Sequence, residues 1–156
     1  MDGLEIRPAA AGDAPVIVAH RRAMFEEMGG AAAEQLDRMD AAFAPWVAVR
    51  LATGEYQGWL AVDAAGGVAG GAGVWVMDWP PHMLHVAARR ANVLNVYVRP
   101  AFRRRGLARR LMQTALDWCR AQGLSVVILH ASQAGRPLYE ALGFRATNEM
   151  RLVLGD

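Results

Sequence analysis

Residues 93–108 read VLNVYVRPAFRRRGLA, and this stretch is the most informative part of the chain. Its first half is a run of strand-forming side chains that Pro100 ends. After Gly106 the pattern changes to helical spacing, because Leu107, Leu111, Ala115 and Trp118 fall on one face of a helix. The sequence therefore predicts a strand over 93–98, a short basic loop, and a helix over 106–122 that stops at Gly123.

The loop between this strand and this helix has the chemistry of an anion site. A helix N-terminus presents unpaired N–H groups and a partial positive charge. Gly106 and Ala108 leave the backbone open to a close ligand, and the arginines add charge and directional donors. The segment predicts a phosphate cradle, although it has neither the lysine of a Walker P-loop nor a G-x-G-x-x-G pattern. The alternative is a solvated basic loop that begins an ordinary helix.

Together with this stretch, the rest of the chain predicts a mixed α/β domain over residues 1–156. The apolar run at 125–130 predicts a strand that is buried on both faces. The whole order is β-α-α-β-β-β-α-β-α-β, an α+β arrangement around a mixed sheet. Before residue 93 we expect a strand at 4–7, helices at 14–28 and 31–52, strands at 59–62 and 68–77, and a loop at 78–91. After the long helix we expect the strand at 125–130, a short helix at 136–142 and a last strand at 147–154.

Composition limits the classes of protein to which the chain can belong. Its 156 residues are 54% hydrophobic and 21% charged, which suits one folded domain. No apolar run is long enough for a membrane span and no secretion signal is present, so we expect a cytoplasmic protein without a membrane partner. The single cysteine, Cys119, excludes an intrachain disulfide and a cysteine-based metal site, and no metal is expected. We expect Cys119 to be a buried hydrophobic side chain rather than a nucleophile.

The charges are unevenly distributed along the chain. All 17 basic residues are arginines; residues 1–78 hold 5 of them against 11 acidic residues, and residues 79–156 hold 12 against 4. Six arginines lie between Arg99 and Arg110 with no acidic residue among them. A cluster confined to one turn indicates a single anionic ligand rather than a nucleic-acid surface.

Two motifs resemble those of the GNAT N-acetyltransferase superfamily. Residues 98–108 look like its motif A, a strand followed by Arg-x-x-Gly-x-Ala, and residues 137–144 (PLYEALGF) look like its motif B. The resemblance implies acetyl-CoA as cosubstrate and a V-shaped opening between the strands at 93–98 and 125–130. It implies that the backbone of Val96, Tyr97 and Val98 binds the pantetheine arm. It places the pyrophosphate on Arg103, Arg104, Arg105, Gly106, Leu107, Ala108 and Arg109.

The resemblance also assigns roles at the reacting centre. Tyr139 matches the tyrosine that protonates the departing thiolate during direct transfer to the amine, the alternative being a tyrosine that only packs. Ser132 stands where many relatives have an asparagine on the pantetheine, so this contact is weaker or lost. Val127 stands where peptide-acetylating relatives often have a glutamate, which counts against N-terminal peptide acetylation. The general base is left open among Asp78, His82, His85, Glu26, Glu27, His130 and water.

The expected acceptor is a small molecule with a primary amine. Acidic residues concentrate where the family frames its acceptor, which predicts a cationic amine; these residues are Glu26, Glu27, Glu34, Asp37, Asp40 and Asp78. The alternative is that they only solvate two helices. Trp75, Trp79 and Tyr97 either wall the acceptor pocket or belong to the core. A non-catalytic acyl-CoA-binding module is the alternative function, and a nucleic-acid-binding protein is disfavoured. The oligomeric state is left open, and a homodimer is compatible with the sequence.

Overall fold

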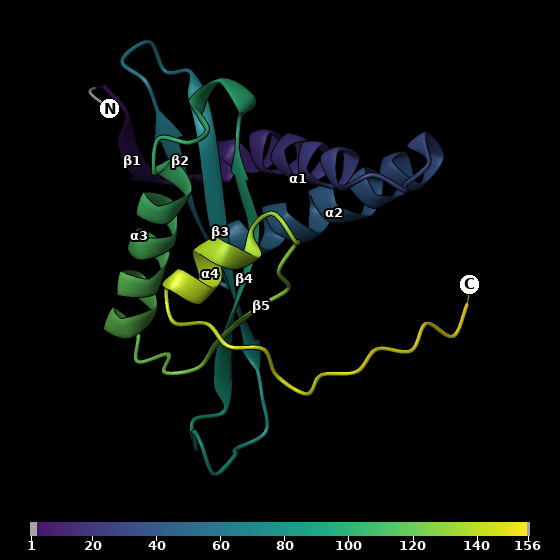
Figure 1. The fold of residues 1–156 in the computed structure, drawn as a ribbon, viewed down its shortest axis with the longest axis vertical. Coiled ribbons are helices and arrows are strands. Elements are labelled where there is room, and N and C mark those ends of the chain that lie inside the picture. Colours follow the sequence, from purple (N-terminus) through teal and green to yellow (C-terminus); the bar gives the residue numbers. More distant parts are fainter. Residues whose placement is uncertain (1–2, 156) are drawn as a thin grey trace.

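The computed structural model describes residues 3–155, which form a five-stranded sheet with helices on both faces (Figure 1). The helices α1 and α2 cover one face, and α3 covers the other. The elements are β1 (Glu5–Pro8), α1 (Ala14–Met28), α2 (Ala33–Thr53), β2 (Tyr56–Val62), β3 (Val68–Asp78), β4 (Arg89–Val98), α3 (Leu107–Ala121), β5 (Val127–Leu129) and α4 (Arg136–Ala141). No helix in this part of the chain combines the length and the apolar character needed to cross a membrane.

The strands follow the order β1-β2-β3-β4-β5 across the sheet. The first four are antiparallel neighbours, and β5 joins β4 in parallel after the α3 crossover. The predicted fold class, a mixed sheet with helices in the expected order through α4, is confirmed.

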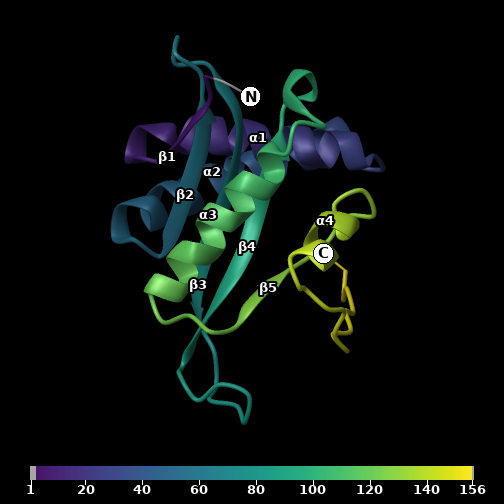
Figure 2. The ribbon, with the colours of Figure 1, turned by 60° about the vertical axis from the view of Figure 1, so that its left-hand side comes forward.

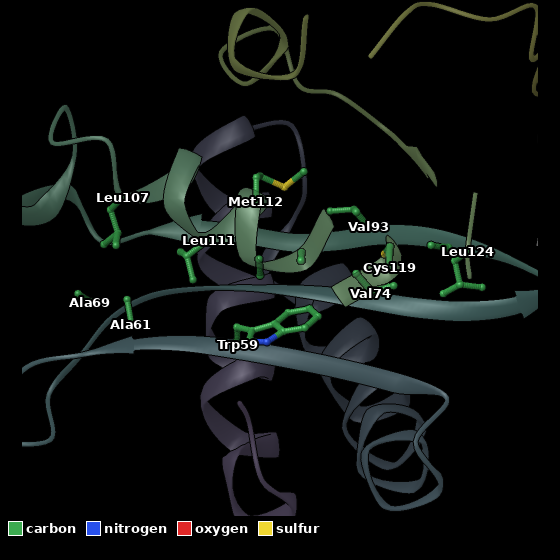
Figure 3. Close-up of a cluster of buried hydrophobic side chains, with 13 residues drawn as sticks. Trp59, Ala61, Ala69, Val74, Val93, Leu107, Leu111, Met112, Cys119 and Leu124 are labelled. Carbon is green, nitrogen blue, oxygen red and sulfur yellow. The ribbon is translucent and has the colours of Figure 1, made fainter. Parts of the chain in front are cut away.

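Two hydrophobic cores hold the helices on the sheet. The larger one lies between the sheet and α3, where Trp59 and Val93 meet Leu111 and Met112 (Figure 3). Cys119 belongs to this core with 1% of its surface exposed, as expected for a small hydrophobic side chain, and burial raises the pKa of its thiol to about 11. The smaller core lies under α1 and α2 and contains Ile17, Phe43, Val47 and Tyr56. Each large side chain fully buried in this way contributes roughly 1.5–3 kcal/mol, so both faces of the sheet need their helices.

A β-bulge interrupts β4 in the middle of the sheet. Ala72 of β3 lies opposite two residues of β4, Asn95 and Val96. Asn95 has a φ of 58°, a left-handed conformation that asparagine tolerates better than most residues. The extra residue turns Asn95 toward α1 and α2, the face on which Leu94 also packs.

Two segments predicted from the sequence have different bounds in the structure. The loop expected at 78–91 is shorter, because β4 already begins at Arg89 and pairs there with Asp78 of β3. The strand expected at 125–130 contains only Val127–Leu129, and it is half-buried rather than buried on both faces because it lies at the sheet edge.

The strand expected at 147–154 is absent from the described residues. This segment leaves the body of the molecule as exposed, irregular chain (Figure 1). Its apolar side chains Met150, Leu152, Val153 and Leu154 are exposed. Alternating apolar residues predict an extended conformation, but a strand also needs a neighbour to pair with, and alternation does not predict one.

Candidate active site

A cavity of about 710 Å³ begins where β4 and β5 separate. The two strands pair only from Ala91↔Val127 to Val93↔Leu129. Beyond that point they diverge, with α4 beside β5 (Figure 2). Within residues 3–155 the edge of β4 after Val93 therefore has no strand neighbour on this side. The V-shaped opening is confirmed, and its volume is in the usual range for a small-molecule site.

The two walls of this cavity differ in the polarity of their side chains. The wall formed by α1, α2 and β3 is apolar and aromatic, with Met24, Phe25, Met28, Met39, Phe43, Trp46 and Trp75. The wall formed by β5, the loop after it and α4 is polar, with His130, Ser132 and Tyr139. No aspartate or glutamate of the described residues lines the cavity. Of the three aromatic residues considered from sequence, Trp75 lines it, whereas Trp79 stacks with Arg90 and Tyr97 packs against His20.

Tyr139 lies on the polar wall and is held there by close packing. Its ring occupies the space beside Gly135, where a β-carbon would come within 2.9 Å of it, and lies edge-on to Phe144, with ring centroids 6.0 Å apart. Burial raises the pKa of the Tyr139 phenol, so the hydroxyl stays protonated at neutral pH. A protonated phenol facing a cavity is a suitable proton donor.

His130 is the base candidate that lines the cavity. Its Nε2 lies 3.1 Å from Oε1 of Glu149, which belongs to the irregular segment after α4. A neutral imidazole that donates from Nε2 to this carboxylate keeps its Nδ1 lone pair free.

The other base candidates lie elsewhere and have other partners. Asp78 pairs in the sheet with Arg89, and His82 and His85 lie in the β3–β4 loop. His82 accepts from the Leu84 backbone, and His85 contacts the Ser125 hydroxyl. Glu26 pairs with Arg22, and Glu27 pairs with Arg103. None of these five side chains lines the cavity.

The N-terminus of α3 has the features that the sequence predicts for a phosphate cradle. Gly106 precedes the helix with a φ of 73°, and a β-carbon there would meet no atom within 4 Å. Arg104, Arg105 and Arg109 are exposed, and the first turn of α3 holds no acidic residue. Arg103 differs, because it donates to both carboxylate oxygens of Glu27 at 2.7 and 2.6 Å and to the Val98 carbonyl. Its guanidinium is therefore committed to contacts within the protein.

The remaining predicted cofactor residues fall into three groups. Val96 and Ser132 line the cavity, and the Ser132 hydroxyl accepts a hydrogen bond from the Gly135 amide at 3.1 Å. Leu107 and Ala108 lie in the first turn of α3, with Leu107 buried in the larger core. Tyr97 and Val98 follow Val96 on the unpaired edge of β4, but the Tyr97 side chain faces α1 and donates to Glu27.

A polar chain in the cavity wall was not predicted. Arg21 of α1 donates to Oδ1 of Asn95 at 2.9 Å, and Asn95 donates to the buried Tyr56 hydroxyl at 3.0 Å. Gly73 leaves the space that this hydroxyl occupies, since a β-carbon there would overlap it. Two signals in the sequence could have indicated this chain: an asparagine inside a run of strand formers, and an arginine on the apolar face of a helix.

Comparison with known proteins agrees with this geometry. The profile of the Acetyltransferase (GNAT) family matches residues 19–144, most of the chain. This chain belongs to the GNAT acetyltransferase family. The crystal structure of a GCN5-related N-acetyltransferase from Ralstonia eutropha JMP134 is 37% identical, with a TM-score of 0.92 over 97% of this chain and 99% of that one.

Two other relatives of this GNAT chain either have lower sequence identity or match less of its length. A predicted acetyltransferase from Clostridium acetobutylicum, solved with acetyl-CoA, has a TM-score of 0.88 over 96% of this chain and 95% of that one, and at 22% identity it shares the fold. Glucosamine 6-phosphate N-acetyltransferase from Trypanosoma brucei brucei is 39% identical over 64 residues, which are 40% of this chain and 44% of that enzyme. The chain thus matches less than half the length of this curated relative.

Proposed function

We propose that this chain is an acetyl-CoA-dependent N-acetyltransferase that transfers the acetyl group directly to a primary amine of a small molecule. The observation that carries the proposal is the cavity at the divergence of β4 and β5, with Tyr139 and His130 on one wall. Family membership supports the same reaction class.

The residues around the cavity fit the cosubstrate in two places. The unpaired edge of β4 at Val96–Val98 offers backbone groups to the pantetheine arm. The N-terminus of α3 offers free amides, with Arg104 and Arg105 beside it, to the pyrophosphate. When bound, acetyl-CoA supplies a thioester carbonyl that an amine nitrogen attacks.

Two side chains divide the proton transfers. Nδ1 of His130 takes a proton from the acceptor ammonium, which gives the nitrogen the lone pair it needs. As the new C–N bond forms and the C–S bond breaks, the Tyr139 hydroxyl gives its proton to the sulfur. The nitrogen then releases its second proton, which restores the Tyr139 hydroxyl and leaves a neutral amide and coenzyme A. Glu149 holds the His130 ring through Nε2 and is a positioning residue.

We propose only that the acceptor is a small molecule with a primary amine. The cationic class that the sequence indicates stays a prediction. Most of the acidic residues on which this prediction rests already form ion pairs within the protein. Arg22 binds Glu26, Asp37 and Asp40, and Arg103 binds Glu27.

The test is a panel of primary amines with thiol detection of released coenzyme A, together with the melting temperature with and without acetyl-CoA. Buried Cys119 adds no background to the thiol signal. We expect acetyl-CoA to raise the Tm, because at 100 times its Kd it stabilises the folded state by about 2.7 kcal/mol. We also expect at least one amine to be acetylated with release of coenzyme A. A Tm shift without turnover on a broad panel would favour a non-catalytic acyl-CoA-binding module. The absence of both a Tm shift and turnover would refute the proposal.

A further inference from the structure

Arg21 lies on the apolar face of α1 and lines the cavity. This face also carries Ile17, Met24 and Phe25 at helical spacing. The guanidinium carbon lies 5.0 Å from the Phe25 ring centroid and 4.6 Å from that of Phe43. These rings and the Asn95 side chain fix the orientation of the guanidinium.

The positive charge of Arg21 has no carboxylate partner within residues 3–155. Its resolved hydrogen-bond partner is the neutral amide of Asn95, and its Nε is buried without one. Burial lowers the pKa of Arg21, which reflects the cost of keeping this charge away from water. A partly buried cation without an anion is costly for a protein to maintain, and a bound anion would offset that cost.

The acidic residues near Arg21 are used elsewhere. Arg22, the next residue on α1, faces away from the cavity and gathers Glu26, Asp37 and Asp40 at 2.7–2.9 Å. Tyr56 and Asn95 face Arg21 from β2 and β4, and neither is charged in the pH range of an assay. The second arginine that lines the cavity, Arg151, adds positive charge to it.

We infer that Arg21 binds an oxyanion of the acceptor, so that the acceptor carries a carboxylate or phosphate beside its amine and an apolar body, as a hydrophobic amino acid does. A guanidinium matches a carboxylate or phosphate in charge and in the geometry of its paired donors. The methionine and aromatic wall beside it takes the apolar body. The inference rests on the proposed acetyltransferase function and specifies its substrate class.

The experiment compares amines that share one apolar body and differ in the anion, together with one purely cationic amine. The panel holds L-phenylalanine, its amide, phenethylamine, the aminophosphonate analogue of phenylalanine, and spermidine as a purely cationic acceptor. For the wild-type protein we expect kcat/KM for phenylalanine or its phosphonate to exceed that for phenethylamine by about tenfold or more, the scale of a charge-assisted hydrogen bond. The carboxylate and phosphonate arms identify which oxyanion the site takes.

Variants assign the preference to Arg21. Arg21→Met should reduce the ratio of kcat/KM for the anionic amine to kcat/KM for phenethylamine by about tenfold or more. Arg21→Lys should retain part of the preference, and Arg38→Met, which removes an exposed arginine of α2 outside the cavity, should change neither rate. If Arg21→Met does not fold, calorimetry on the wild-type protein with coenzyme A replaces it, and N-acetylphenylalanine should bind more tightly than N-acetylphenethylamine.

The outcomes separate this inference from the proposed function. If acetyl-CoA raises the Tm and phenethylamine or spermidine is the better acceptor, the inference is wrong and the acetyltransferase proposal stands. Equal binding of the two products would also overturn the inference. If acetyl-CoA does not bind and no amine is acetylated, both are wrong.

Discussion

Tyr139 has the two properties that a proton donor to a thiolate needs. It lines the cavity, and its burial keeps the phenol protonated. Tyr139→Phe keeps the ring and its contact with Phe144 and removes only the donor. We expect kcat to fall roughly 10- to 1,000-fold with little change in acetyl-CoA affinity. Steady-state kinetics with an acceptor for which chemistry is rate-limiting checks this, and an unchanged kcat would remove Tyr139 from the mechanism.

His20 makes the stability of the fold depend on pH. It is buried against Tyr97, and burial, with a smaller effect of Arg99, lowers its pKa to about 4. The unfolded chain takes up this proton near pH 6.5, whereas the folded chain does so only near pH 4. The unfolding free energy should therefore fall by up to about 3 kcal/mol as the pH drops from 6.5 to 4, with no further contribution from His20 outside this window.

Urea unfolding at several pH values checks the His20 prediction. His20→Gln removes the titrating group and should flatten the dependence between pH 6.5 and 4. His82→Gln is the control, because His82 is exposed in the β3–β4 loop. Parallel curves for wild type and His20→Gln would show that another group controls acid stability.

At the scale of elements, substitutions of the two glycines at the ends of α3 distinguish an effect on cofactor binding from an effect on helix stability. Gly106 and Gly123 have φ values of 73° and 70°, and neither has an atom within 4 Å of a β-carbon position. Valine at either site costs about 1–2 kcal/mol of backbone strain. We expect both Gly106→Val and Gly123→Val to lower the Tm, and only Gly106→Val to lose the stabilisation by acetyl-CoA. Thermal melts with and without acetyl-CoA measure both effects, and a full shift in Gly106→Val would refute the cradle.

The elements that the sequence predicts well are those with a strong local signal. The run at 93–98 and the helix after Gly106 form as expected, since a continuous apolar pattern and a glycine boundary are local properties. Residues 147–154 show the limit, because pairing depends on a neighbour that their own pattern does not specify. The Arg21–Asn95–Tyr56 chain depends on a bulge and on contacts between residues 39 and 74 positions apart, which no local pattern encodes.

At the scale of the whole molecule, the uneven charge has a consequence for the rate of cofactor binding. Arg104, Arg105 and Arg109 are exposed around the start of α3, where a polyanionic cosubstrate would approach. We expect kcat/KM for acetyl-CoA to fall as ionic strength rises, because at 0.1 M salt the attraction between exposed charges is largely screened beyond about 10 Å.

A salt titration of wild type and two single variants checks this steering. Arg105→Gln should flatten the dependence, and Arg38→Gln, an exposed arginine of α2, should leave it unchanged. A kcat/KM for acetyl-CoA that is independent of salt in all three proteins would show that the arginines do not steer the cosubstrate.

The exposed segment after α4 also determines what proteolysis does to this protein. Residues 145–155 are exposed and lack helix or strand hydrogen bonds, which is the state of chain that proteases cleave, and Arg145 is a site for trypsin-like enzymes. Cleavage there would remove Glu149 from His130 and Arg151 from the cavity, and leave the sheet and both cores untouched. A clipped sample would keep its circular dichroism and its cooperative melting while the candidate active site lacked two side chains, so the mass of the chain distinguishes a damaged preparation from an intact but inactive one.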